Sequence, residues 1–113
     1  CEGGYDAFNK MHAKGPLPSS IFVCNDMMSM GVINAANEKG IRVPQDLSII
    51  GYDDIQISKF MTPALTTIHQ PKYRLGKAAV EALLKKLDGG ETEPQVVQLE
   101  PTLIERKTVR ALS

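Results

Sequence analysis

Apolar residues follow two spacings along this chain of 113 residues, and these spacings predict helices that alternate with strands. A spacing of three to four residues, typical of an amphipathic helix, occurs in three segments: 5–12, 26–39 and 72–87. Short runs of β-branched and other apolar residues, typical of buried strands, occur in five segments: 20–24, 47–52, 65–68, 96–99 and 102–104. A weak helical turn is also expected over 55–60. This alternation predicts an α/β fold with a parallel sheet.

Glycine and proline residues set the predicted boundaries of the helices. Gly15 and Pro16 end the first helix, because proline lacks a backbone N–H and fixes its own φ. Gly40 follows the second helix, at the position where glycine commonly adopts a left-handed conformation. The long third helix begins after Pro71 and ends at Asp88.

Polar side chains stand where two predicted strands end. Asn25 and Asp26 follow the first strand and begin a helix, and Asp53 and Asp54 follow the second strand. The carboxyl ends of parallel strands form the edge at which open α/β folds bind their ligands. We therefore expect the ligand site to lie at this edge.

Two roles are open for Asn25 and Asp26. One of them caps the helix and satisfies backbone N–H groups that otherwise lack a partner. Alternatively they point into a cleft, where Asp accepts and Asn both donates and accepts hydrogen bonds from vicinal hydroxyl groups, as in sugars. The roles are compatible, because one residue can cap while the other binds.

Composition and charge narrow the functions open to this chain. The 13 basic and 13 acidic residues cancel, so the chain lacks the positive field on which nucleic-acid binding depends. No apolar run approaches the roughly 18 residues that span a membrane. Cys1 and Cys24 lack the spacing of a CxxC motif, and we expect Cys24 to be a buried, reduced thiol. These features indicate a cytoplasmic chain with no membrane contact.

An enzymatic role has weak support. Asp53 and Asp54 at a strand end could bind a metal ion or act in phosphoryl transfer. However, the sequence has no evident Ser-His-Asp or Cys-His set and no phosphate-binding glycine loop, and His12 and His69 have no partner at metal-ligand spacing. We therefore predict no catalytic residue, no metal site and no cofactor.

The predicted core is small for an independent domain. Three or four short strands leave the long helix 72–87 without an obvious strand of its own to cover. We expect this chain to be one piece of a larger fold, rather than a lipoprotein processed at Cys1.

Five motifs occur in a specific order and spacing: CNDMMSMG at 24–31, GIRVPQD at 40–46, GYDD at 51–54, TPALTTIHQP at 62–71 and LIER at 103–106. This succession resembles the C-terminal part of the lactose/galactose-repressor family of bacterial transcription regulators. Within that family, the FMTP and TTIHQP wording is most similar to the ribose-operon and purine repressors.

The resemblance implies an effector-binding domain of the periplasmic-binding-protein type, in which two α/β lobes close on a small molecule. It assigns residues 1–70 to the second lobe, 71–100 to a crossover helix and strand that pack on the first lobe, and 101–113 to a returning strand and C-terminal tail. The implied hinge residues are His69, Gln70 and Pro71.

The same resemblance implies that Asn25, Asp26 and Asp53 line the effector cleft. Purine binders of the family tend to carry a small residue at the Asn25 position, whereas sugar binders keep the carboxamide. The expected effector is therefore a small sugar such as ribose, and a purine is the less favoured choice.

The family also forms homodimers and reaches operator DNA through an N-terminal helix-turn-helix, which is absent from these residues. The implied dimer contacts are Met30, Phe60 and Met61, although a methionine at the helical spacing of Met30 also fits a core position. The expected function is the ligand-sensing part of a transcriptional repressor. The alternative is a periplasmic sugar-binding protein of a transport system, which shares the fold but begins with a signal peptide and usually lacks the LIER wording.

Overall fold

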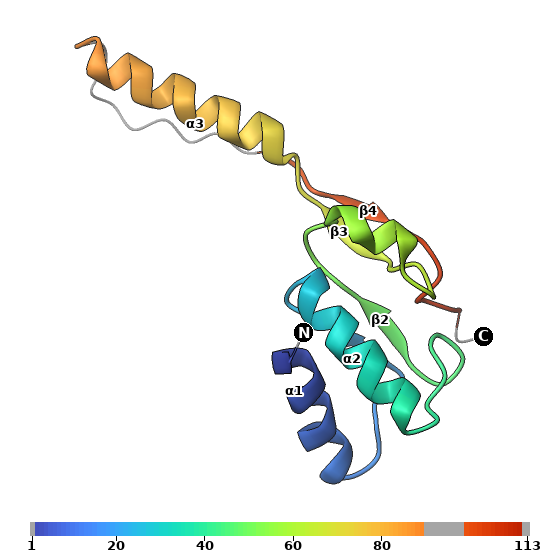
Figure 1. Ribbon diagram of the computed structural model, residues 1–113. Helices are drawn as coiled ribbons and strands as arrows, with labels where there is room; N and C mark the ends of the chain where they lie inside the picture. Colours follow the sequence, from blue (N-terminus) through green and yellow to red (C-terminus); the bar gives the residue numbers. More distant parts are fainter. Residues whose placement is uncertain (1, 90–98, 112–113) are drawn as a thin grey trace. The chain divides into compact units, whose positions relative to one another are not determined.

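The computed structural model describes residues 2–89 and 99–111, and the chain divides into two compact units. The first unit comprises Cys1–His69 and Leu103–Ser113, and the second comprises Gln70–Thr102. Figure 1 labels the helices and strands of both units. No helix among the described residues is long and apolar enough to cross a membrane.

Two helices of the first unit, α1 (Glu2–Ala13) and α2 (Asp26–Glu38), lie side by side (Figure 1). Both confirm helices predicted from apolar spacing. Gly4 allows their close approach, because a Cβ at this position would overlap the backbone oxygen of Met28. Gly40, with φ +72°, follows α2 in the left-handed conformation that was predicted for it.

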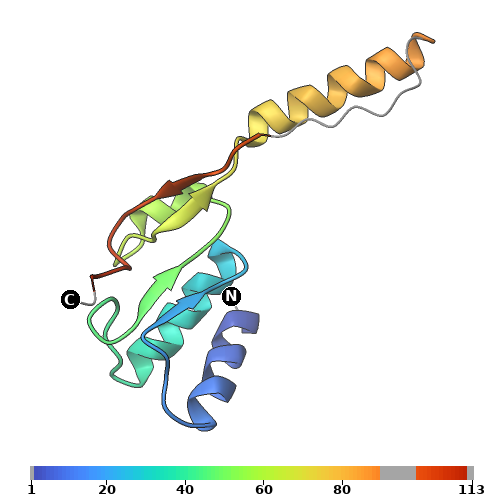
Figure 2. The ribbon, with the colours of Figure 1, turned by 180° about the vertical axis from the view of Figure 1, so that it is seen from behind.

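The first sheet consists of β1 (Ser20–Phe22) and β2 (Ser48–Ile50), which pair in parallel with Ile21 opposite Ile49. Figure 2 shows these strands from behind, with both helices on one face of the sheet. The parallel pairing confirms the predicted α/β class. Both strands are shorter than predicted, and β1 ends where the chain turns to enter α2.

Two further strands, β3 (Thr67–His69) and β4 (Thr102–Ile104), are hydrogen-bonded neighbours. Two isolated parallel bridges connect β2 and the loop after it with the region of β3. Ile50 pairs with Thr66, and Asp53 pairs with His69. The predicted helical turn is also present, as the short 3-10 helix η1 at Gln56–Phe60.

The core of the first unit lies between the helices and the strands. Its buried apolar residues come from the two helices, from β2 and from positions just before or after strands: Phe8, Val23, Val32, Ile33, Ala35, Ala36, Leu47, Ile49 and Leu65. Thr108, after β4, is also buried, and its hydroxyl donates to the Ile49 carbonyl oxygen at 2.6 Å. The returning segment is thereby attached to β2.

Cys24 departs from the prediction. It lies between the end of β1 and the start of α2, and it is exposed. The prediction of a buried thiol is therefore wrong: Val23 is the residue of this segment that packs into the core, and Cys24, which follows it, is exposed.

The described part of the second unit consists largely of α3 (Lys72–Leu87), whose bounds agree with the prediction. None of the α3 residues is buried within the described part of the chain. The large apolar side chains that it exposes are Tyr73, Leu75, Val80, Leu83, Leu84 and Leu87. Packing of α3 on another lobe stays a prediction, and most of the predicted strand at 96–99 lies outside the described residues.

We expect Gly4→Ala to destabilise the first unit, whereas the matched variant Gly3→Ala should not. The new Cβ at Gly4 would overlap backbone that cannot move without separating α1 from α2, and overpacking of this kind costs about 1–3 kcal/mol. A Cβ at Gly3 meets no atom within 4 Å, so this alanine should gain at most about 1 kcal/mol of helix propensity. Urea unfolding followed by circular dichroism measures both effects. Equal midpoints for the two variants would contradict the close contact.

Candidate functional site

Asn25 caps α2 at the point where the chain leaves the first sheet. Its backbone is extended, with φ −158° and ψ 168°, and its Oδ1 accepts a hydrogen bond from the Met28 N–H at 2.8 Å. The Asn25 carbonyl oxygen accepts a second bond from the Ser29 hydroxyl at 2.9 Å. Of the two candidate caps, Asn25 therefore takes the capping role. It is half-buried, and its side-chain amide nitrogen takes no part in the cap.

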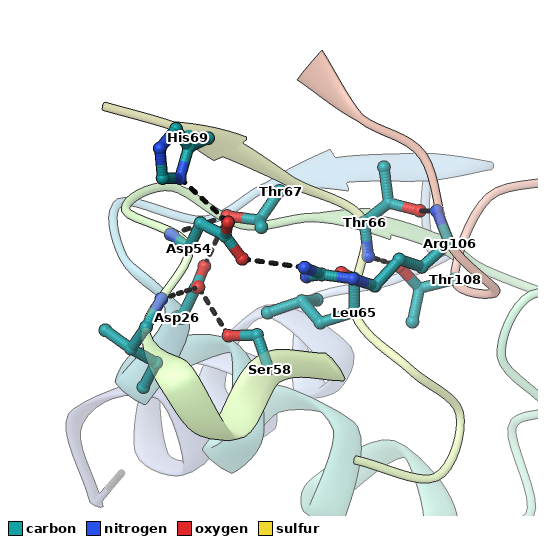
Figure 3. Close-up of polar contacts among 10 residues, drawn as sticks. Asp26, Asp54, Ser58, Leu65, Thr66, Thr67, His69, Arg106 and Thr108 are labelled. Carbon is teal, nitrogen blue, oxygen red and sulfur yellow. Dashed lines mark hydrogen bonds and ion pairs between the residues drawn. The ribbon is translucent and has the colours of Figure 1, made fainter. Parts of the chain in front are cut away.

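Asp26 lies in the interior, with no exposed surface. Its Oδ2 accepts from the Ile55 N–H at 3.0 Å and from the Ser58 hydroxyl at 2.5 Å, and its Oδ1 accepts from the Thr67 hydroxyl at 2.6 Å (Figure 3). These donors belong to the loop after β2, to η1 and to β3. The structure therefore gives Asp26 a joining role among three segments, and its contact with an effector stays a prediction.

The first residue of the GYDD motif, Gly51, leaves no room for a side chain. A Cβ at this position would overlap Asp26 Oδ1 and would lie 2.9 Å from Ser29 Oγ. The following residue also contacts this region, because the Tyr52 carbonyl oxygen accepts from the Asp26 N–H at 3.1 Å. Glycine at 51 is thus required for the chain after β2 to pass close to the start of α2.

Asp53 and Asp54 follow with positive φ values of +122° and +53°. Such values are uncommon for residues other than glycine and persist only where the surroundings hold them. The Asp53 N–H donates to the Ile68 carbonyl oxygen at 2.9 Å, which attaches this loop to β3. Asp53 is half-buried. It follows β2 and pairs with His69 at the end of β3, which places it at the predicted edge.

The Asp54 carboxyl group has two charged or chargeable partners. Oδ1 accepts from Arg106 Nη2 at 2.8 Å, and Oδ2 lies 2.9 Å from His69 Nδ1 (Figure 3). Burial raises the pKa of Asp54, but the hydrogen bonds and charges of Arg106 and His69 outweigh it, so the pKa lies below its ordinary value of 3.8.

Sequence reasoning did not find this network. It considered Asp54 for metal binding or phosphoryl transfer, it took His69 as a lone histidine and an implied hinge residue, and it gave Arg106 no role although LIER was among the family motifs. Ser58 and Thr67 were also missed. The available signal was weak, because hydroxyl residues and an arginine in short mixed segments do not by themselves indicate a polar network.

The other predicted residues occupy varied positions. Met30 and Met61 are half-buried, whereas Phe60 has 72% of its surface exposed. The first unit ends at His69 and the second begins at Gln70, within the predicted hinge. Neither hinge motion nor dimer contact is tested by these positions, and both stay predictions.

Two hollows lie elsewhere in the first unit. One, of about 160 Å³, is lined by apolar residues of α1, β1 and α2, including Phe8, Val23 and Val32. The other, of about 500 Å³, lies over α1 and α2 and includes Met30 and Glu38. Neither is lined by Asn25 or by Asp53. Within residues 2–89 and 99–111, no three His, Cys, Asp or Glu side chains form a group that could hold a metal ion.

We expect Asp26→Asn to destabilise the first unit by about 1–3 kcal/mol, because an amide nitrogen cannot accept the hydrogen bonds that a carboxyl oxygen accepts. Asp6→Asn, on the exposed surface of α1, is the matched control and should change stability by less than about 0.5 kcal/mol. Urea unfolding of both variants makes the comparison. If the two variants proved equally stable, the joining role of Asp26 would be wrong.

We expect the Asp54 carboxyl group to stabilise the folded protein only while it is ionised, and this stabilisation should be lost at acidic pH. Since its folded-state pKa is lowered, its contribution is fully present above the ordinary pKa and is lost as pH falls through the folded-state value. The stability difference between wild type and Asp54→Asn, measured by urea unfolding, should shrink as pH falls below about 4. A difference that does not vary with pH would count against the ion pairs.

The chain was also compared with known proteins. The periplasmic binding protein-like domain family matches residues 2–109. The HTH-type transcriptional repressor PurR of Pasteurella multocida is 48% identical over 110 residues, which are 97% of this chain and 33% of that repressor. This chain therefore spans about a third of the length of such relatives.

Two solved structures are also similar. The lac repressor dimer bound to operator and the anti-inducer ONPF has a TM-score of 0.88 and 36% identity, covering 96% of this chain and 37% of that one. A LacI family transcriptional regulator from Enterococcus faecium with bound ribose has a TM-score of 0.88 and 30% identity, covering 99% and 41%. Because the family match extends over nearly the whole chain, this protein belongs to the periplasmic binding protein-like domain family, and its expected resemblance to the lactose/galactose-repressor family is confirmed.

Proposed function

We propose that this chain is the effector-sensing part of a bacterial transcriptional repressor, and that the effector is a small sugar with ribose as the first candidate. The observation that carries the proposal is the placement of Asn25 and Asp53, which follow the carboxyl ends of two paired parallel strands. This edge is where open α/β folds bind ligands. The likeness to a LacI family regulator that holds ribose supports the same choice.

The chemistry of the two residues suits sugar hydroxyl groups. Asn25 uses Oδ1 for the helix cap, which leaves the hydrogens of its amide nitrogen for a ligand oxygen. The carboxyl group of Asp53 supplies an acceptor at the same edge. A donor beside an acceptor matches a pair of vicinal hydroxyl groups. We propose that Asp26 supports both residues from the interior, and a direct contact between Asp26 and an effector stays a prediction.

A purine base is the second candidate effector. It is favoured by the 48% identity to a repressor named PurR. Asn25 argues for the sugar, because a carboxamide there fits the sugar-binding members of the family. The alternative of a periplasmic transport receptor gains no support from these comparisons, in which the similar proteins are repressors and transcription regulators.

We propose a cytoplasmic homodimer that includes Met30, Phe60 and Met61 in its interface. The family resemblance implies these contacts, and Phe60, which has 72% of its surface exposed, adjoins a second bulky apolar residue, Met61. Effector binding would shift the population of lobe arrangements about a hinge at 69–71. The dimer would pass this change to operator-binding segments that lie outside these 113 residues.

Asn25→Ser tests the proposal in the intact protein. Serine keeps an oxygen for the helix cap, so stability should change by less than about 0.5 kcal/mol, whereas ribose affinity should fall about tenfold through the loss of one hydrogen bond to the ligand. Asn34→Ser is the matched control, because Asn34 is exposed on the same helix. Isothermal titration calorimetry with ribose and with hypoxanthine measures the affinities.

The possible results are distinct. Binding of ribose that weakens only in Asn25→Ser supports both the sugar and the residue. Binding of hypoxanthine alone makes the purine the effector class. Binding of ribose with equal affinity in both variants removes Asn25 from the site, and binding of neither compound by the wild-type protein makes the proposed effector classes wrong.

A further inference from the structure

Asp54 contacts both segments by which the chain leaves and re-enters the first unit. His69, on one carboxyl oxygen, ends β3 and is the last residue before the chain passes into the second unit. Arg106, on the other carboxyl oxygen, follows β4, shortly after the chain returns at Leu103. One side chain on the loop after β2 thus contacts two segments that are distant in the sequence (Figure 3).

The ion pair between Asp54 and Arg106 is less exposed than a surface ion pair. The side chains of Asp54 and Arg106 are each only 16% exposed, and Arg106 Nη1 also donates to the Leu65 carbonyl oxygen at 2.9 Å. By contrast, the pair formed by Arg42 and Asp46 has side chains that are 70% and 40% exposed. Partly buried, charge-assisted hydrogen bonds are stronger than exposed ones, which contribute little.

Asp54 directly follows the proposed effector residue, Asp53, in the sequence. Asp53 and Asp54 both have positive φ, so this turn needs surrounding contacts to hold it. The Asp53 N–H bonds to the Ile68 carbonyl oxygen, and Asp53 forms a parallel bridge with His69. The Asp54 side chain supplies further contacts of this kind, through its hydrogen bonds with His69 and Arg106.

We propose that Asp54 is a positioning residue that holds the Asp53 loop against both crossing segments, so that effector binding at Asp53 and changes in these segments are coupled through the Asp54 carboxyl group. The coupling rests on the proposed function, because it needs an effector at Asp53. The holding role does not, since all of its contacts lie within the first unit.

Hydrogen exchange followed by mass spectrometry tests the holding role in the intact protein without ligand. Asp54→Asn should speed exchange about tenfold or more in peptides that cover residues 52–57, 66–70 and 103–107, through the loss of charge-assisted hydrogen bonds. Exchange in α2 should change little. Asp46→Asn, which removes the exposed ion pair of the same unit, should leave all of these peptides unchanged.

A second variant distinguishes the proposed holding role of Asp54 from a general loss of stability in the first unit. Arg106→Gln should speed exchange in the peptides 52–57 and 103–107, and adding Asp54→Asn should produce little further change in 103–107, because both substitutions remove the interaction that these residues share. The peptide 66–70 should exchange faster in the double variant, because Asp54→Asn also weakens the contact with His69. Equal acceleration throughout the first unit, or no difference between Asp54→Asn and Asp46→Asn, would overturn the proposal.

The coupling is tested with ribose and hypoxanthine as probes. In the wild-type protein, the bound compound should slow exchange in the crossing segments, whereas saturating Asp54→Asn with the same compound should not. Protection of these segments in Asp54→Asn equal to that in wild type would overturn the coupling. If the wild-type protein bound neither compound, the proposed effector classes would fail, and exchange without ligand would still decide whether Asp54 holds the loop.

Discussion

The buried carboxyl group of Asp26 determines how the segments around the candidate site are arranged. A carboxyl group that is removed from water costs several kcal/mol unless polar partners surround it. Three segments supply these partners, through Ile55, Ser58 and Thr67. The donors are useful only if the loop after β2, η1 and β3 all meet at the start of α2, and Gly51 is needed for that approach. The site therefore rests on an interior polar contact as well as on an apolar core.

The contacts of Asp26 continue into those of Asp54. The Thr67 hydroxyl donates to Asp26 at 2.6 Å and accepts from the Asp54 N–H at 3.4 Å, so the two aspartates share a neighbour. Asn25 and Asp53, the residues proposed to meet an effector, each adjoin one of these aspartates in the sequence. The residues proposed to bind the effector thus have sequence neighbours whose own orientations are held by hydrogen bonds. Such support is the usual requirement for precise ligand recognition.

The two units differ in how they use apolar side chains. In the first unit, helices and strands bury many of them in a common core, although others, including Phe22 and Phe60, are exposed. In the second, α3 exposes its large apolar residues. Because the removal of apolar surface from water lowers the free energy, both α3 and Phe60 are suited to contacts with other protein segments. This agrees with a chain that spans about a third of the length of its relatives.

The sequence by itself determined the elements and their class. Apolar spacing predicted α2 and α3, residue type predicted a cap at the start of α2, and alternation of helix and strand predicted parallel pairing; all of these depend on neighbours within a few residues. Only the tertiary structure decided the interior position of Asp26 and the partners of Asp54. The donors to Asp26 lie 29, 32 and 41 residues away, and the partners of Asp54 lie 15 and 52 residues away. Local periodicity carries no information about such pairs, because packing of distant segments selects them.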